Sequence, residues 1–270
     1  MSKPRRLTGI AGVIIVIAAG SLSISSLRNE YVVPIIMYHS VNPKSDPLMK
    51  RLIVSPETFE RQMRFLKRHH YNVLPLETLV QLIKEENVPP KAVAITFDDG
   101  YKDNYAYAFP VLKKYNLPAT IFIIVNEAGR PQADRLSWDE IKAMQGSGLI
   151  TFGSHALGPE PLINVKSKEE VKMQVSGSKK ILEQKLARKV NLFSYPEGMF
   201  DAGTRQLVID AGYLAAVATK PGKKYSACDV FALKRIRISE NASNMLIFAV
   251  ETSGFYTFMK GRSKFKYGKK

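Results

Sequence analysis

Two adjacent carboxylates, Asp98 and Asp99, end a short apolar run and are followed by Gly100. Neighbouring residues of a strand point to opposite sides, so both acids cannot lie comfortably in one apolar core. At least one of them is therefore expected to work in a polar site. The alternative is an ordinary surface turn, because the sequence Asp-Asp-Gly also suits a turn.

Two other strand-like runs end in polar or conformationally special residues. His155 follows residues 149–154, and the tetrapeptide 195–198, Tyr-Pro-Glu-Gly, follows another such run. The carboxyl ends of parallel strands collect at one rim of a barrel. We therefore expect Asp98, Asp99 and His155 to meet at that rim despite their separation in sequence.

These segments resemble the polysaccharide deacetylases, that is, the nodulation-type deacetylase domain of carbohydrate esterase family 4. The resemblance extends from about Pro34 to about Val250. The matching segments occur in the family's order and are residues 37–41 (Met-Tyr-His-Ser-Val), 96–100 (Thr-Phe-Asp-Asp-Gly), 117–122 (Leu-Pro-Ala-Thr-Ile-Phe), 153–155 (Gly-Ser-His), 195–198 (Tyr-Pro-Glu-Gly), 211–213 (Ala-Gly-Tyr) and 235–236 (Arg-Ile).

An alternation of strand and helix patterns predicts the architecture. Short β-branched runs alternate with longer helical patterns, which is typical of βα units and a parallel sheet. Strands are expected at residues 35–38, 73–74, 92–97, 119–125, 150–153, 191–194, 215–219 and 234–238. Helices are expected after the capping signal Ser55-Pro56 and at residues 76–84, 105–115, 138–145, 168–186 and 204–211. The prediction is an α/β fold, an incomplete or distorted (β/α) barrel of about seven parallel strands, with a doubly wound open sheet as the alternative.

The resemblance implies roles for the two acids and the histidine. Asp98 would be the general base, and Asp99 and His155 would bind a divalent metal, Zn²⁺ first, with Co, Fe, Ni or Mn as other choices. Such an ion lowers the pKa of bound water and polarises a carbonyl group. The family usually carries a second histidine four residues after the first, and Pro159 stands there in this chain. Glu160 is the predicted replacement ligand, and the alternative is that it is a solvated loop acid.

Two further residues are expected to take over roles that the family assigns elsewhere. No histidine follows His155 in the sequence, so the family's late Leu-x-His, which carries the general acid, has no counterpart. His39 ends the first predicted strand and is expected at the same rim, either as proton donor or as third metal ligand. The arginine that many relatives place just before the Tyr-Pro-Glu-Gly motif is also missing. Arg235 or Arg237 is predicted to approach Asp98 in its place.

The remaining candidates would contact the substrate. Tyr195, Pro196 and Gly198 belong to the third motif, whose backbone N–H groups could form part of an oxyanion site. Trp138, the only tryptophan, precedes a predicted helix and could stack on a sugar ring. Its alternative role is packing into the core, which is common for aromatic residues at helix starts.

The amino terminus carries a membrane-targeting pattern. A basic start is followed at residues 7–27 by an uncharged stretch that is long enough to cross a bilayer as one apolar helix. We interpret it as a signal anchor, with a cleaved signal peptide as the alternative. Both predict an extracytoplasmic domain of the bacterial cell envelope, membrane-anchored or secreted. The expected domains are the signal segment at 1–27, the barrel at 28–255 and a basic tail at 256–270.

The net charge of +16 gives the chain a substantial positive field. Much of the excess falls in residues 166–189 and in the tail, which we interpret as solvated surface, with contact to anionic lipid head groups or anionic wall polymers as the alternative. Nucleic acid is not an expected partner, because export places the domain where little nucleic acid is present. The single cysteine, Cys228, excludes an internal disulfide.

Together these features predict a metal-dependent hydrolase that removes N-acetyl groups from an extracytoplasmic polysaccharide containing N-acetylglucosamine. One alternative is a catalytically silent relative that has lost its metal and only binds carbohydrate, as Pro159 would suggest. Another is an esterase that removes O-acetyl groups from a polysaccharide with the same apparatus. The intact Asp98, Asp99 and His155 favour an enzyme over a binding module.

Overall fold

The computed structural model describes four stretches of the chain, residues 32–44, 51–130, 134–219 and 229–256. It divides into two units, of which the larger is Val33–Ser253. The smaller unit combines Met1–Val32 with Gly254–Lys270. In its described part, the backbone N–H of Val32 donates to the carbonyl of Gly254 at 2.9 Å.

The two predicted terminal segments fall almost entirely outside these stretches. The signal segment, residues 1–27, lies outside the described residues, and so does the basic tail from residue 257 onward. Within the four described stretches, no helix is long and apolar enough to span a bilayer.

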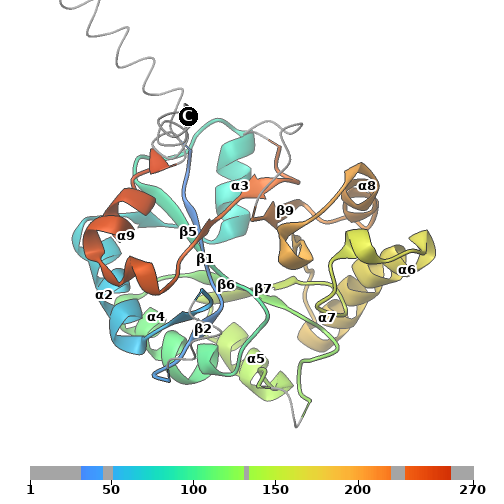
Figure 1. The fold of residues 1–270 in the computed structure, drawn as a ribbon, viewed down its shortest axis with the longest axis horizontal. Helices are drawn as coiled ribbons and strands as arrows, with labels where there is room; N and C mark the ends of the chain where they lie inside the picture. Colours follow the sequence, from blue (N-terminus) through green and yellow to red (C-terminus); the bar gives the residue numbers. More distant parts are fainter. Residues whose placement is uncertain (1–31, 45–50, 131–133, 220–228, 257–270) are drawn as a thin grey trace, which may run out of the picture. The chain divides into compact units, whose positions relative to one another are not determined.

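A parallel sheet of nine strands forms the centre of the larger unit, as far as the structure describes it (Figure 1). Its strand order is β10-β9-β8-β7-β6-β5-β1-β11, and β4 pairs with β5 beside this path. A separate pair joins β2 to β3. The eight strands of the main path form a nearly closed barrel, so the predicted (β/α) barrel is confirmed. The strands are β1 (Ile35–Tyr38), β2 (Ser40–Val41), β3 (Ile53–Val54), β4 (Asn72–Val73), β5 (Ala92–Phe97), β6 (Ala119–Ile123), β7 (Ile150–Ser154), β8 (Leu192–Ser194), β9 (Ala215–Ala218), β10 (Leu233–Lys234) and β11 (Ile236–Arg237).

Arg235 lies where the chain passes from one end of this strand order to the other. β10 and β11 are the two terminal strands of the order, and Arg235 is the only residue between them. Its backbone N–H donates to the carbonyl of Ala218 in β9 at 3.0 Å. Three residues later, the N–H of Ile238 donates to Met37 in β1 at 2.9 Å. The chain therefore bridges the two edges of the sheet within a few residues.

Helices surround the strands (Figure 1). Helix α2 (Pro56–Arg68) begins as its sequence predicts, because Ser55 Oγ accepts a hydrogen bond from the Thr58 N–H at 3.2 Å. Phe59 and Met63, four residues apart, are buried on its inner side. The helices are α2 (Pro56–Arg68), α3 (Leu76–Lys84), α4 (Phe109–Tyr115), α5 (Trp138–Gly146), α6 (Lys168–Lys172), α7 (Ser178–Leu186), α8 (Ala202–Asp210) and α9 (Met245–Glu251). All but α9 were predicted from the sequence.

Two π-helical turns interrupt helices that the sequence predicts as continuous. The turn η1 (Asn104–Ala108) leads into α4, and η3 (Met173–Gly177) joins α6 to α7. Such turns are rare and frequently adjoin functional sites. Short 3₁₀ turns complete the described elements: η2 (Leu162–Asn164), η4 (Pro196–Gly198) and η5 (Glu240–Ser243).

Alternate strand residues face two different cores. Ile36 and Tyr38 of β1 belong to the larger cluster, which lies between the strands and the helices. Ile35 belongs to a second cluster on the other face of the sheet, the interior of the barrel, together with Phe122 of β6. A Cβ atom at Gly153 would lie 2.5 Å from the Phe122 ring, so the interior is filled at this level.

Candidate active site

Strand alternation places several polar side chains on the inner face at the carboxyl ends of the strands. Asp98 lies two residues after Thr96, just past β5, and His155 directly follows β7. Ser194 ends β8, and Arg235 lies between β10 and β11. All five side chains are buried. Because the strands are parallel, these residues meet at one rim of the barrel.

Arg235 forms a two-pronged ion pair with Asp98. Nη1 of Arg235 donates to Asp98 Oδ1 at 2.7 Å, and Nη2 donates to Oδ2 at 2.6 Å. Nη2 also donates to Ser194 Oγ at 2.9 Å, and Nη1 to Thr96 Oγ1 at 3.3 Å. Burial opposes ionisation of Asp98, but Arg235 and then His155 hold the pKa of this carboxyl well below its usual range. Asp98 is therefore an ionised carboxylate held in a fixed orientation.

The two ring nitrogens of His155 have different partners. Nδ1 lies 2.8 Å from the Ser194 carbonyl oxygen, so Nδ1 carries a proton and donates it. Nε2 lies 3.4 Å from Asp99 Oδ1 and 4.0 Å from Asp98 Oδ2. Burial alone would lower the pKa of His155, but the carboxylates of Asp98 and Asp99 raise it above the ordinary value. The ring thus presents Nε2 to both acids.

Each of the three site loops contains a non-glycine residue with a positive φ. The angle is 68° at Asp99, 62° at Ala156 and 55° at Glu197. A non-glycine residue in this region costs about 1–3 kcal/mol, and it persists only where the surrounding structure fixes the backbone. At Asp99 this turn also ends the strand alternation, which allows two neighbouring acids to approach the same histidine.

His39 is buried beside the two carboxylates. It lies between β1 and β2, and its Nδ1 has no hydrogen-bond partner. Burial lowers the pKa of His39, while the charges of Asp98 and Asp99 oppose this shift without cancelling it. The neutral imidazole is therefore favoured, with one orphaned nitrogen in a site that contains two acids.

The structure does not bring Glu160 to Asp99 and His155. Glu160 is exposed, and the loop before it is held in place at Leu157 and Gly158. The carbonyl of Leu157 accepts from the Asn126 N–H at 2.9 Å, and the N–H groups of Leu157 and Gly158 both donate to Gln174 Oε1 at 3.1 Å. The inward bulge that a Glu160 ligand requires is therefore absent from this loop.

Three of the four residues of the Tyr-Pro-Glu-Gly motif are buried, and only Glu197 is exposed. The N–H of Tyr195 donates to the Val217 carbonyl at 3.1 Å, so it is engaged in the sheet and does not point freely at a substrate. The Tyr195 hydroxyl donates to the Phe231 carbonyl at 3.1 Å. Pro196 and Gly198 are also buried. These residues fix the loop that follows β8.

Gly198 is the one position of this motif where only glycine fits. Its φ is +70°, and a Cβ atom there would lie 2.4 Å from the Thr219 backbone nitrogen. We expect Gly198→Ala to lower the free energy of unfolding by about 2–4 kcal/mol, from left-handed strain and overpacking. Gly146→Ala is the control, because a Cβ there meets nothing within 4 Å. Thermal unfolding of both variants checks this, and an equal loss in both would contradict it.

Arg237 and Trp138 lie outside the buried cluster of acids and histidines. Arg237 is exposed, so Arg235 is the arginine that reaches Asp98. Trp138 is partly buried against the outer core at the start of α5, and Lys185 Nζ lies 5.5 Å from its ring centroid. These contacts match the packing alternative for Trp138.

Several site contacts were not predicted from the sequence. Thr96 and Ser194 anchor Arg235, and Gln174 anchors the loop after His155. The signal for Thr96 was its position two residues before Asp98, on the same side of the strand. Gln174 had no comparable signal, because its direction depends on the π-helical turn η3.

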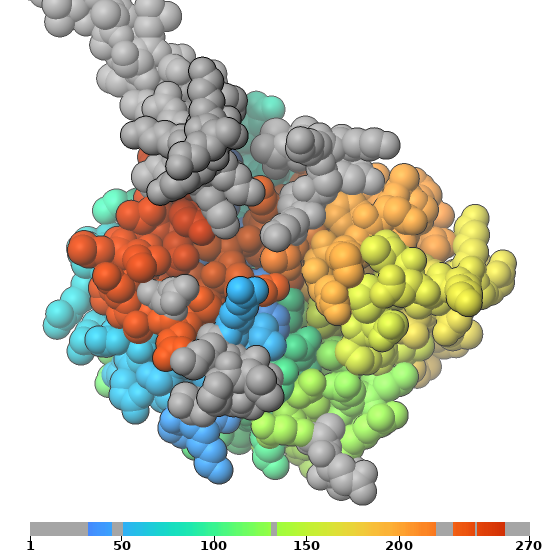
Figure 2. Space-filling view, viewed as in Figure 1, coloured from blue at the N-terminus to red at the C-terminus, as the bar shows by residue number. Residues whose placement is uncertain are grey.

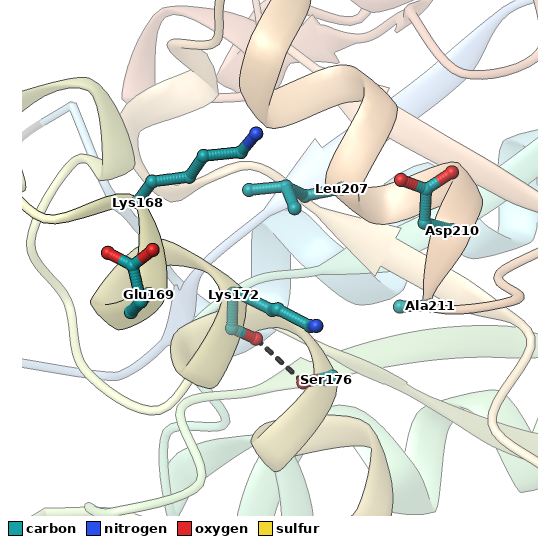
Figure 3. A pocket seen from close by; sticks show the side chains of 7 residues that line it. All are labelled: Lys168, Glu169, Lys172, Ser176, Leu207, Asp210 and Ala211. Atoms are coloured by element: carbon teal, nitrogen blue, oxygen red, sulfur yellow. Dashed lines mark hydrogen bonds between the residues drawn. The ribbon is translucent and has the colours of Figure 1, made fainter.

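A cavity of about 500 Å³ lies on the outer side of the barrel, between α6–η3 and α8 (Figure 3). In Figure 2 the same helices form adjoining yellow and orange surfaces at one side. The Ser176 hydroxyl donates to the Lys172 carbonyl within this lining (Figure 3). None of the predicted site residues belongs to the cavity, whose lining is Lys168, Glu169, Lys172, Ser176, Leu207, Asp210 and Ala211.

A buried Asp98, a half-buried Asp99 and a histidine at the carboxyl ends of a parallel barrel are typical of an enzyme active site. Comparison with known proteins specifies the class further. A sequence model described as "Polysaccharide deacetylase" matches residues 85–216. The Bacillus subtilis protein YxkH, provisionally named a polysaccharide deacetylase, is 34% identical over 78% of this chain and 72% of its own length.

One further relative and one solved structure that resemble this chain are also named deacetylases. The poly-β-1,6-N-acetyl-D-glucosamine N-deacetylase of Staphylococcus aureus is 29% identical over 74% of this chain and 72% of its own length. The structure of Streptococcus pyogenes deacetylase PplD in complex with acetate superposes with a TM-score of 0.72 at 29% identity, covering 80% of this chain and 97% of that chain. The chain belongs to the polysaccharide deacetylase family, and is a hydrolase of that family.

Proposed function

We propose that the chain removes N-acetyl groups from an extracytoplasmic polysaccharide that contains N-acetylglucosamine. The observation that carries this proposal is the buried pair of Asp98 and Arg235 beside Asp99 and His155. One carboxylate is held ionised for proton transfer, while the other faces an imidazole nitrogen. The two acids can therefore divide the roles of base and ligand.

We assign the metal position to Asp99 and His155. The Nδ1–H of His155 donates to a backbone carbonyl, which is the outer contact that metal-binding histidines usually make. His39 adds a neutral imidazole whose buried Nδ1 is orphaned. Among the described residues, no three His, Cys, Asp or Glu side chains are already grouped as a complete site. His39 or water would therefore complete the coordination.

The donor set suits Zn²⁺, with Co, Fe, Ni or Mn as alternatives. A bound divalent ion would polarise the acetamide carbonyl and acidify a water molecule. The roles of the protein residues follow from the geometry. His155 and Asp99 orient each other through Nε2 and Oδ1, and Ser194 fixes the tautomer of the ring.

Asp98 is proposed to take the proton of the attacking water. Arg235 keeps this carboxylate ionised and fixes its orientation. The protonated Asp98 formed in this step would then pass its proton to the departing amine. His39 would need to be protonated for that task, which its lowered pKa disfavours, so we propose it as the third ligand.

The substrate and the location are proposed from the relatives and the sequence. The Staphylococcus aureus relative is named for poly-β-1,6-N-acetyl-D-glucosamine, so oligomers of this sugar are the first substrate to test. The basic start and the apolar stretch at residues 7–27 support a membrane-anchored or secreted enzyme of the cell envelope. The positive charge supports contact with anionic lipid or wall polymer.

Metal removal tests the proposal. Chelation of the purified full chain is expected to lower acetate release from β-1,6-linked N-acetylglucosamine oligomers by more than about 100-fold, since such an ion stabilises the transition state by several kcal/mol. Readdition of Zn²⁺ should restore release. Asp99→Asn and His155→Ala should lose bound metal, measured by elemental analysis. Glu160→Gln, which changes an exposed side chain, should retain it.

Two outcomes would contradict parts of this assignment. Undiminished acetate release from the metal-free enzyme would show that the reaction needs no metal ion. Carbohydrate binding without release under any divalent ion would support the catalytically silent alternative, which Pro159 in place of the second histidine favours. Acetate release from O-acetylated xylan oligomers alone would support the esterase instead.

A further inference from the structure

We infer that Asp103, with the neighbouring Asn104, is a positioning residue for His39. This inference rests on the proposed function, in which His39 works beside Asp98 and Asp99. Both residues lie at the start of the π-helical turn η1, which leads into α4. Asp103 and Asn104 contact the backbone of His39 and the residues after it, so they can act on the imidazole only by fixing the position of this backbone.

Asp103 binds the chain segment that follows His39 at three consecutive residues. Ser40 Oγ donates to Asp103 Oδ2 at 2.5 Å, and the Val41 N–H donates to Oδ1 at 3.1 Å. Asn42 Nδ2 also donates to Oδ2, at 3.3 Å. One carboxylate therefore fixes both backbone and side chains of the strand β2, which directly follows the histidine.

Asn104 binds His39 itself. Its Nδ2 donates to the His39 backbone carbonyl at 2.8 Å and to Asp103 Oδ1 at 3.0 Å. Asn104 is fully buried, and Asp103 is 5% exposed, so water does not compete for these bonds. On the other side, the Asp98 N–H donates to the Tyr38 carbonyl at 3.0 Å. His39 is thus held between the strand that bears the base and the π-helical turn.

The chemistry of this site requires a carboxylate rather than an amide at position 103. Its four partners, Ser40, Val41, Asn42 and Asn104, all act as donors, and only an ionised carboxylate accepts through both oxygens. Burial raises the pKa of Asp103. Burying this acid among neutral donors is costly, which suggests that a fixed backbone at His39 compensates for it.

Asp103→Asn is nearly isosteric, but it turns an amide N–H₂ toward groups that are themselves donors. The imidazole of His39 can be followed directly in the full chain, which has only four histidines. We expect the histidine NMR signals of His39 to shift in the variant. His69 and His70 are exposed, and their signals should stay unchanged as internal controls.

Kinetics supply a second readout that a purely structural role would not move. Asp103→Asn should lower kcat by about 10–100-fold through misplacement of His39, with little change in KM. In a His39→Ala background the same substitution should change kcat by less than about twofold, because the two residues act as one unit. Asp201→Asn, which changes an acid that caps α8, is the matched control and should leave kcat unchanged.

The outcomes separate this inference from the proposed function. Additive losses in the double variant, or unshifted His39 signals in Asp103→Asn, would overturn the positioning role while the deacetylase assignment stands. Absence of acetate release by the wild-type chain would overturn the assignment, and the NMR comparison would still decide whether Asp103 places His39.

Discussion

Replacement of Asp98 by asparagine is expected to lower acetate release by about 10²–10⁴-fold, the usual contribution of a positioned general base. The amide keeps the shape of the carboxylate, and its oxygen can still accept from Arg235. It cannot take a proton from water. The loss should therefore fall on kcat, with bound metal retained, because Asp99 and His155 are unchanged.

Acetate release, metal content and thermal unfolding of Asp98→Asn must be measured together. The substitution removes a buried negative charge beside Arg235, so some loss of stability is expected as well. A folded, metal-containing variant with wild-type release would show that Asp98 is not the base. Release that recovers only when the variant is refolded would point to a structural role instead.

The second large effect is expected for Arg235→Met, which leaves Asp98 buried without its cation. Breaking a buried ion pair from one side typically costs about 3–5 kcal/mol of unfolding free energy. Arg235 also donates to Ser194 and Thr96, and it lies between the two terminal strands of the barrel, so the loss should be near the upper end. Arg237→Met is the control, because Arg237 is exposed only two residues away.

The same variant has a distinct pH signature. In the wild type, Arg235 helps to hold the pKa of folded Asp98 below its unfolded value. The stability from this pair is therefore fully present above the unfolded pKa and is lost as the pH falls through the lower folded pKa. Without Arg235 the pKa of Asp98 should rise, so the acidic limb of the pH–rate profile should move to higher pH. An acidic limb at the same pH as in the wild type would contradict the tuning role.

Local sequence patterns were sufficient for most of the strands and helices. The expected helix at residues 76–84 coincides with α3, and the expected strand at 92–97 coincides with β5. Strand alternation and capping residues are local signals, so they need no knowledge of distant contacts. The π-helical turns and α9 escaped prediction, because such elements depend on what the neighbouring segments require.

The sequence also determined which residues meet at the rim. Strand ends, together with the family resemblance, predicted that Asp98, Asp99 and His155 meet, since parallel strands bring their carboxyl ends together. The hydrogen-bond and ion-pair partners of these residues could not be predicted in this way. Whether Arg235 or Arg237 reaches Asp98 depends on which of two nearby residues faces the barrel interior at the point where the sheet closes.

Only the tertiary structure determined the position of Glu160 and the contacts around His39. Hydrogen bonds to the segment after β6 and to the side chain of Gln174 hold the loop after His155, and Glu160 is exposed. Asp103 lies more than sixty residues from the segment it fixes, so no local pattern links the two. The sequence by itself predicted the barrel, because strand and helix patterns are short-range, and its resemblance to the polysaccharide deacetylases implied which residues form the site. Only the folded chain determined their charge states and partners, because burial and ion pairing arise between segments that are far apart in sequence.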